Sequence, residues 1–226
     1  MKMALSGRLF ESQTGYSMDL ESFLRFARDT GCEGVEIRYP QLPLETAVER
    51  QEEVAGLLEE LDLTWVYGAV EGIIGQEDFD RAVEMLDLHR RCGCAYTRFT
   101  IFEPEDISWA QRFADEAAER GQRTIMQVHT GTLPDTVDNA LETLERIDRP
   151  NVGLAYEACH LVFEDVEDYV AAIPPLAPHL YCVALQNYKP AGPPDPEETV
   201  VEINGTRYVR AVPGDPDGID FEAVFG

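Results

Sequence analysis

The sequence predicts an α/β fold of the (β/α) barrel type, with about seven parallel strands and no eighth β/α unit. Short apolar runs alternate with longer amphipathic runs about every 30 residues, which is typical of parallel strands joined by helical crossovers. A doubly wound sheet would usually carry a Gly-rich phosphate loop, and neither GxGxxG nor GxxxxGK occurs in the sequence. The barrel is the remaining arrangement.

The elements follow one another in a regular order. We expect strands at residues 3–10, 32–39, 63–70, 95–102, 123–129, 151–160 and 180–188. We expect helices between them at residues 18–31, 43–62, 78–93, 106–121, 133–148 and 165–178, because their apolar residues recur at helical spacing. Ser17 is the expected N-cap of the first helix, and Gly31 closes it.

The rhythm breaks after Tyr188, where a Pro-rich loop is followed by alternating apolar residues around Asn204-Gly205, a strong hairpin signal. We interpret residues 1–226 as a single barrel domain with this loop and hairpin at about 190–212. A barrel without an eighth strand has an open edge, which must find a partner. The hairpin could cover it, the barrel could close with fewer strands, or a homodimer could form there; we favour the hairpin or the homodimer.

The composition restricts the partners. There are 43 acidic and 18 basic residues, giving a net charge of −25, and such an acidic protein repels nucleic acid and anionic membranes. No run of about 18 apolar residues predicts a membrane span. Five cysteines and an N-terminal stretch without a long apolar run indicate free thiols in the cytoplasm. A small-molecule substrate is therefore the expected partner.

Polar residues gather at the carboxyl ends of the later strands, which form the catalytic face of a barrel. Gln127 and His129 share one face of the fifth strand, Glu157 ends the same face of the sixth, and Gln186 that of the seventh.

Other polar residues have plainer explanations. Glu36 and Arg38 lie on one face of the second strand and either contact a substrate or pair with each other. His89 is expected to be a solvated helix residue, and His179 to end a helix where a cation suits the dipole.

Four segments resemble the xylose isomerase-like barrels, a family of sugar isomerases, sugar-phosphate isomerases and epimerases. They are YSMDLESFLRFARDTGCEGVEIR, MQVHTGTLPDTVDNALETLERIDRPNVGLAYEACH, PHLYCVALQN and VRAVPGDPDGIDFEAVF. The resemblance implies a divalent ion (Mn, Mg, Co or Zn) held by a Glu, an Asp, a His and a final Glu. It polarises a sugar carbonyl while carboxylates move the proton.

The implied ligand set is largely substituted in this sequence. The fifth-strand Glu falls on Gln127, the sixth-strand Asp on Glu157 and the seventh-strand His on Ala184, while the eighth strand is missing. His160 keeps the acid-x-x-His spacing, and Arg210 is the nearest match to an Arg that touches substrate. Because a hard divalent ion prefers anionic oxygen, Glu157 and Gln127 would hold it weakly or not at all.

Two functions from different classes remain open, so the sequence does not decide whether the chain is an enzyme. The first is a sugar or sugar-phosphate isomerase or epimerase, with Glu157 as base or surviving ligand and His160 binding a hydroxyl. Gln127 and Gln186 would then orient the substrate. The alternative is a catalytically degraded barrel that binds a sugar-like ligand or a protein partner. A repair endonuclease is disfavoured, because four His and a net charge of −25 do not suit several zinc ions and DNA.

Overall fold

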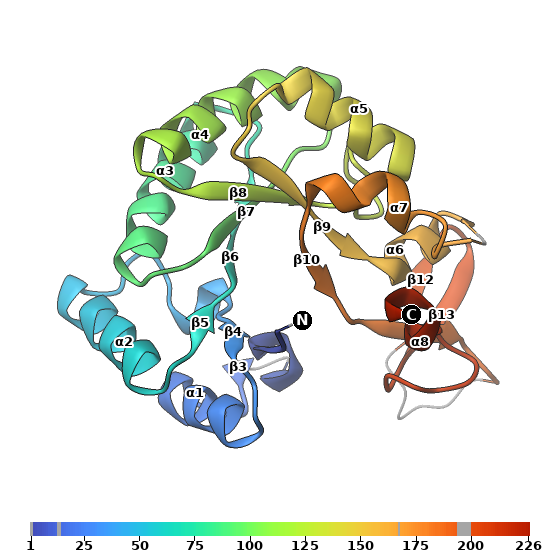
Figure 1. The fold of residues 1–226 in the computed structure, drawn as a ribbon, viewed down its shortest axis with the longest axis horizontal. Coiled ribbons are helices and arrows are strands. Elements are labelled where there is room, and N and C mark those ends of the chain that lie inside the picture. Colours follow the sequence, from blue (N-terminus) through green and yellow to red (C-terminus); the bar gives the residue numbers. More distant parts are fainter. Residues whose placement is uncertain (1, 13–14, 167, 194–199) are drawn as a thin grey trace. The chain divides into compact units, whose positions relative to one another are not determined.

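The computed structural model describes residues 2–12, 15–166, 168–193 and 200–226 (Figure 1). Residues 194–199 of the expected Pro-rich loop lie outside this range. The chain divides into two compact units. The first comprises residues 1–101, 105–125 and 149–152, and the second residues 102–104, 126–148 and 153–226. The interpretation of residues 1–226 as one barrel domain stays a prediction.

The first unit contains the early strand–helix pairs. Its elements are β1 (Ala4–Ser6), η1 (Gly7–Phe10), β2 (Glu11–Ser12), β3 (Gly15–Tyr16), α1 (Leu20–Asp29), β4 (Gly34–Glu36), η2 (Tyr39–Gln41), α2 (Val48–Glu60), β5 (Thr64–Trp65), β6 (Tyr67–Gly72), α3 (Gln76–Arg91), β7 (Tyr96–Thr100) and α4 (Ile107–Glu119). η3 (Pro104–Asp106), β8 (Arg123–Gln127) and β9 (Val152–Glu157) cross from one unit into the other.

The strands pair in parallel, as the crossovers predict. One sheet has the order β1-β4-β5 and another the order β10-β9-β8-β7-β6, where β10 spans Leu180–Ala184. The third expected strand is therefore two: β5 pairs with β4, and β6 pairs with β7. The carbonyl oxygens of Trp65 and Val66 accept hydrogen bonds from the N–H groups of Ala95 and Tyr96. The backbone between β5 and β6 is therefore already bonded to the segment that begins β7. These parallel strands confirm the α/β barrel class.

The second unit departs from the expected boundaries. Its other elements are α5 (Val137–Ile147), α6 (Ala158–Phe163), α7 (Ile173–Leu176), η4 (Ala177–His179), β11 (Asn187–Pro190), β12 (Val200–Ile203), β13 (Thr206–Ala211) and α8 (Phe221–Phe225). The sixth strand ends at Glu157 rather than His160, because the next residues begin α6. The helix expected over residues 165–178 is reduced to the single turn of α7, which carries two prolines near its start, where proline is tolerated.

A three-stranded antiparallel sheet follows β10, with the order β11-β13-β12. Asn204 and Gly205, both at positive φ, form the turn between β12 and β13. Tyr188 of β11 and Tyr208 of β13 are buried, and their ring centroids lie 5.2 and 4.8 Å from that of Phe163 in α6. The side-chain amide of Asn204 also donates a hydrogen bond to the Phe163 carbonyl oxygen at 2.9 Å. The hairpin is thus packed onto α6.

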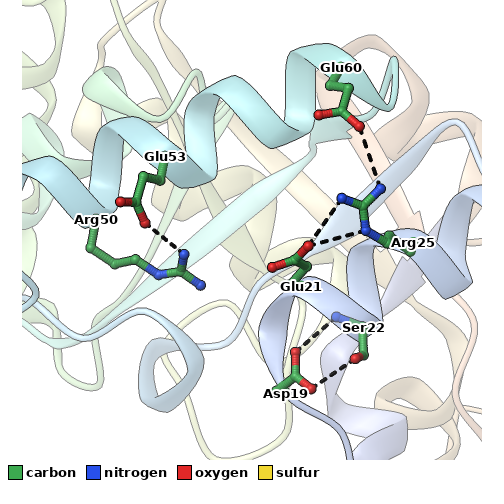
Figure 2. A network of polar contacts seen from close by, with 7 residues as sticks. All are labelled: Asp19, Glu21, Ser22, Arg25, Arg50, Glu53 and Glu60. Atoms are coloured by element: carbon green, nitrogen blue, oxygen red, sulfur yellow. Dashed lines mark hydrogen bonds and ion pairs between the residues drawn. The ribbon is translucent and has the colours of Figure 1, made fainter.

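Helix α1 shows how the few cations are used (Figure 2). Its N-cap is Asp19, not the expected Ser17, because the Asp19 carboxylate accepts from the N–H of Ser22 at 2.9 Å. Arg25 contacts Glu21 at 3.0 Å on its own helix and Glu60 of α2 at 3.5 Å. The Arg25 guanidinium thus forms ion pairs with two carboxylates. Exposed ion pairs of this kind stabilise a fold only slightly. No helix in the described part of the chain is long and apolar enough to cross a membrane.

His89 is buried, which corrects the expectation that it is solvated. It is 1% exposed, its Nδ1 lies 2.8 Å from the Thr97 hydroxyl, and its ring meets Trp65 edge-on at 5.0 Å. A Cβ atom on Gly68 would lie 2.3 Å from His89 Nε2, so glycine is required there. Desolvation lowers the pKa of His89 to about 3.

We expect His89 to make stability depend on pH in weak acid. The folded chain keeps it neutral down to about pH 3, whereas an unfolded histidine is protonated below about pH 6.5. The unfolded state therefore binds more protons between these values. As a result the free energy of unfolding decreases as the pH is lowered from about 6.5 to about 3, by up to about 1.4 kcal/mol per pH unit. Urea unfolding at several pH values measures this dependence. The free energy of unfolding of His89→Gln should decrease less steeply than that of the wild type as the pH is lowered. His179→Gln, which changes an exposed side chain, should follow the wild-type curve. Parallel curves for wild type and His89→Gln would contradict this expectation.

Tyr208 tests the packing of the hairpin on α6. Tyr208→Ala removes a buried ring that contacts Phe163, and comparable losses cost about 3 kcal/mol. Arg207→Ala, one residue earlier and exposed, should change stability by less than about 0.5 kcal/mol. Chemical denaturation measures both variants. Equal stabilities would show that the hairpin is not held by this contact.

Candidate functional site

The carboxyl ends of β8 and β9 bring two polar side chains together. The strands are neighbours in the sheet, and the N–H of Val128 donates to the Ala155 carbonyl oxygen at 3.0 Å. Gln127 and Glu157 are the last residues of their strands, and the Gln127 amide donates a hydrogen bond to Glu157 Oε2. Glu157 is only 5% exposed. A buried carboxylate thus lies at the barrel position where catalytic groups occur.

His160 approaches the same carboxylate oxygen from the following helix. It lies in the first turn of α6, and its Nε2 is 3.4 Å from Glu157 Oε2. Residues three apart lie on one side of a helical turn, so the acid-x-x-His spacing produces this contact directly. Its Nδ1 is buried and has no hydrogen-bond partner among the described residues.

His129 stacks on His160. Their ring centroids are 3.6 Å apart with an angle of 33° between the planes. His129 Nδ1 lies 2.6 Å from the Thr130 carbonyl oxygen, which only accepts, so this nitrogen carries a proton. Thr130 in turn donates its hydroxyl hydrogen to the His160 carbonyl oxygen at 3.2 Å. The segment after β8 therefore fixes the position of the His160 ring.

Aromatic residues that the sequence did not single out form a cluster that contacts His160 through Phe163. The Phe163 ring lies 5.6 Å from that of His160, edge-on, and it also contacts Tyr188 and Tyr208. The alternation of Tyr208 with polar residues in the hairpin was the only sequence signal for this cluster. The imidazole consequently has a buried aromatic ring beside it.

Gln186 and Arg210 both lie next to Tyr188. Gln186 follows β10, and its amide donates to the Tyr188 hydroxyl at 2.8 Å. Arg210 is paired with Tyr188 across β11 and β13, so both side chains project from one face of that sheet. Arg210 is exposed. The structure thus joins Gln186 and Arg210 through Tyr188, whereas their contact with a substrate stays a prediction.

Glu36 and Arg38, in the first unit, pair with each other. Arg38 donates to Glu36 Oε1 at 2.9 Å, and the Ser6 hydroxyl donates to Glu36 Oε2. Burial opposes the charged form of Arg38, but Glu36 and, to a smaller extent, Glu11 and Tyr67 together outweigh this effect, so the pKa of Arg38 is raised. Their role in substrate binding stays a prediction.

Parallel strands that end in a buried carboxylate, an amide and an imidazole define the class of the protein as a (β/α) barrel with a polar site at its strand ends. The family model for the xylose isomerase-like TIM barrel matches residues 24–226. The chain therefore belongs to the xylose isomerase-like TIM barrel family. A search of curated proteins finds no significant match.

Solved structures share the fold at low identity. A xylose isomerase-like TIM barrel protein from Mycobacterium smegmatis in complex with magnesium has a TM-score of 0.75 and 15% identity, covering 99% of this chain and 84% of its own. The probable 3-DHS dehydratase AsbF from Bacillus anthracis has a TM-score of 0.70 and 19% identity, covering 84% and 74%. D-allulose 3-epimerase from Methylomonas sp. in complex with D-allulose has a TM-score of 0.65 and 16% identity, covering 81% and 71%.

The family's four-ligand site for a hard divalent ion does not fit these residues. The Gln127 amide points a hydrogen-bond donor at Glu157, where the resemblance implies a second carboxylate. β10 ends in Ala184, which supplies no imidazole. One carboxylate oxygen is too little charge for a hard ion such as Mg²⁺. No step of the chemistry below is therefore assigned to such an ion.

Gln127→Glu tests this conclusion. The substitution puts two carboxylates side by side in a buried place, so without added cation the melting temperature should fall. Mn²⁺ should then stabilise the variant more than the wild type, because a second anionic oxygen is available. Gln127→Met also loses the hydrogen bond but adds no charge, so it should respond to Mn²⁺ like the wild type. A wild-type protein that already responds as strongly as Gln127→Glu would show that the ligands are misplaced.

Proposed function

We propose that the protein is a sugar or sugar-phosphate isomerase or epimerase that transfers a proton next to a carbonyl group of a small polyhydroxylated substrate. The observation that carries the proposal is the buried Glu157 carboxylate with Gln127 and His160 at one of its oxygens. A carboxylate held in one orientation by neighbouring polar groups can accept a proton from a substrate C–H group placed beside it.

The roles of the residues follow from their contacts. Glu157 removes the proton from the carbon next to the carbonyl, and the electron pair of that C–H bond moves toward the carbonyl oxygen. His160, beside Glu157, binds the neighbouring hydroxyl or the developing oxyanion. Return of the proton from Glu157 to the adjacent carbon, with transfer of the hydroxyl proton to the former carbonyl oxygen, completes an isomerisation. In an epimerisation the carbon instead receives a proton from water on the opposite face, and Glu157 releases its proton to solvent.

Two neighbouring residues position the reacting groups in the proposal. Gln127 holds Glu157 through its amide, and His129 holds the ring of His160. Structures that share the fold include an epimerase and a probable dehydratase, and both reactions can begin with loss of a proton next to a carbonyl.

The remaining polar candidates are substrate contacts in the proposal. Gln186 and Arg210, next to the Tyr188 side chain, bind the far end of the substrate. Glu36 and Arg38 are further contacts of the same kind.

Solvent exchange tests the proposal whatever the identity of the product. Wild-type protein incubated in D₂O with a panel of ketoses, aldoses and their phosphates should incorporate deuterium next to the carbonyl of its substrate, as seen by NMR. Glu157→Gln should lower the rate by about 10²–10⁴-fold, since a positioned base contributes that much. Glu145→Gln, at an exposed position of α5, should keep the wild-type rate.

The outcome separates the two functions that the sequence left open. Exchange that depends on Glu157 supports the enzyme. Saturable sugar binding without any deuterium exchange would favour the catalytically degraded barrel. That alternative rests on Gln127 and Ala184, which replace two of the implied metal ligands.

The proposed location of the protein is the cytoplasm, and its proposed oligomeric state is a homodimer. None of the five cysteines forms a disulfide, which suits a reducing compartment; they are Cys32, Cys92, Cys94, Cys159 and Cys182. Among the described strands, β1 pairs only with β4, and β10 pairs only with β9. Such edges can pair with a second copy. Sedimentation equilibrium should give twice the mass of the chain, and a monomer at all concentrations would rule out the homodimer.

A further inference from the structure

Three buried hydrogen-bond donors in the first unit have no acceptor among the described residues. They are the hydroxyl of Tyr16 in β3, the Nε of Arg38 after β4 and the Nε2 of Gln41 in η2. Arg38 and Gln41 can only donate at these nitrogens, and the tyrosine hydroxyl carries one donor hydrogen. Because buried polar atoms are normally satisfied, a group that accepts hydrogen bonds is expected beside them.

The three side chains lie together at the carboxyl end of β4. Gln41 Oε1 accepts a hydrogen bond from the N–H of Arg38 at 3.0 Å, so the amide is held with its Nε2 as a donor and cannot be turned round. Burial raises the pKa of Tyr16, Glu11 on the paired strand β2 adds to this effect, and the Arg38 guanidinium acts against both. The hydroxyl therefore stays protonated and lies within reach of Arg38.

The acceptors around these donors are already engaged. Glu36 Oε1 receives a hydrogen bond from Arg38 Nη1 at 2.9 Å, and Glu36 Oε2 receives one from the Ser6 hydroxyl. Gln41 Oε1 is taken by the backbone of Arg38. A water molecule would supply an acceptor, but it would also bring two hydrogens that need acceptors of their own. A monatomic anion accepts several hydrogen bonds and brings no hydrogen.

We propose that Tyr16, Arg38 and Gln41 bind one small inorganic anion, chloride in a physiological medium. The three donor atoms are buried, so their common acceptor must be small and enclosed by the chain. A phosphate or carboxylate on an organic molecule belongs to a larger group that needs access from outside. Hydrogen bonds from an ionised donor to an anion are stronger than neutral ones, and Arg38 supplies that charge.

The charges around Arg38 permit an anion on one side of its guanidinium. Glu36 contacts Nη1, whereas the unsatisfied N–H belongs to Nε, on another edge of the planar group. An ion at Nε touches the guanidinium, and the Glu36 carboxylate lies beyond it, so the attraction acts over the shorter distance. Glu36 and Glu11 oppose the anion in part, and reversible rather than permanent binding is therefore expected.

The anion is separate from the proposed proton transfer. It would link Tyr16 of β3 to the segment that joins β4 to η2, so its expected effect is on the stability of the first unit. An ion that binds only the folded chain stabilises it by mass action. The site is assigned from its donors alone and is measured without any sugar, so it does not depend on the proposed function.

Denaturation at a constant sodium concentration tests the site. Replacing gluconate by chloride leaves the screening of the acidic surface unchanged, and gluconate is too large to be enclosed. The unfolding equilibrium constant should decrease by about tenfold when chloride reaches about ten times its dissociation constant, and the effect should saturate. Gln41→Glu keeps the oxygen that accepts from Arg38 but replaces the donor by an anionic oxygen, so it should lose this effect. Tyr39→Phe, which removes a hydroxyl of η2 bonded to Glu45, should retain it.

Bromide locates the ion directly, because it scatters X-rays anomalously. A wild-type crystal grown in sodium bromide should show one anomalous peak in contact with Tyr16, Arg38 and Gln41, and Gln41→Glu should show none there. Tyr16→Phe removes only the hydroxyl and should weaken the chloride response, so it serves as a second variant; circular dichroism shows which variants fold. A water molecule or apolar side chains in place of the peak would overturn the site. An equal chloride response of the wild type and the folded variants would do the same, and both results leave Glu157-dependent deuterium exchange untouched.

Discussion

The buried carboxylate of Glu157 is the constraint around which the second unit is organised. An ionised carboxylate at 5% exposure is costly unless it receives hydrogen bonds or charge, and β8 and α6 each direct a polar group at it. Gln127 comes from the neighbouring strand and His160 from the next turn of the chain. The requirement to satisfy this one group therefore fixes the end of β9, the start of α6 and the placement of the segment after β8.

The same constraint explains why the C-terminal sheet packs where it does. α6 presents Phe163 one turn beyond His160, and that ring needs cover from water. Tyr188 and Tyr208 provide it from β11 and β13. Asn187 ties the last segment to this sheet, because its side chain donates to the Val212 carbonyl oxygen and accepts from the N–H of Ile219, both at 2.8 Å. The hairpin thus contributes an apolar wall beside the candidate site.

Substitution of the family ligands changes the chemistry that the site can support. An amide at residue 127 leaves Glu157 hydrogen-bonded, which suits a base that is held in one orientation.

The sequence by itself determined the alternation of strands and helices, since apolar periodicity is a property of neighbouring residues. It also determined the Asn204-Gly205 turn, because that turn depends on neighbouring residues. Only the tertiary structure decided that His89 is buried against Trp65, where helix α3 meets distant strands. It likewise decided that Asp19 rather than Ser17 caps α1 and that β5 and β6 are separate strands. Gln127 received its partner Glu157 in the same way, because the packing of segments far apart in the chain sets which polar groups lose water and what replaces it.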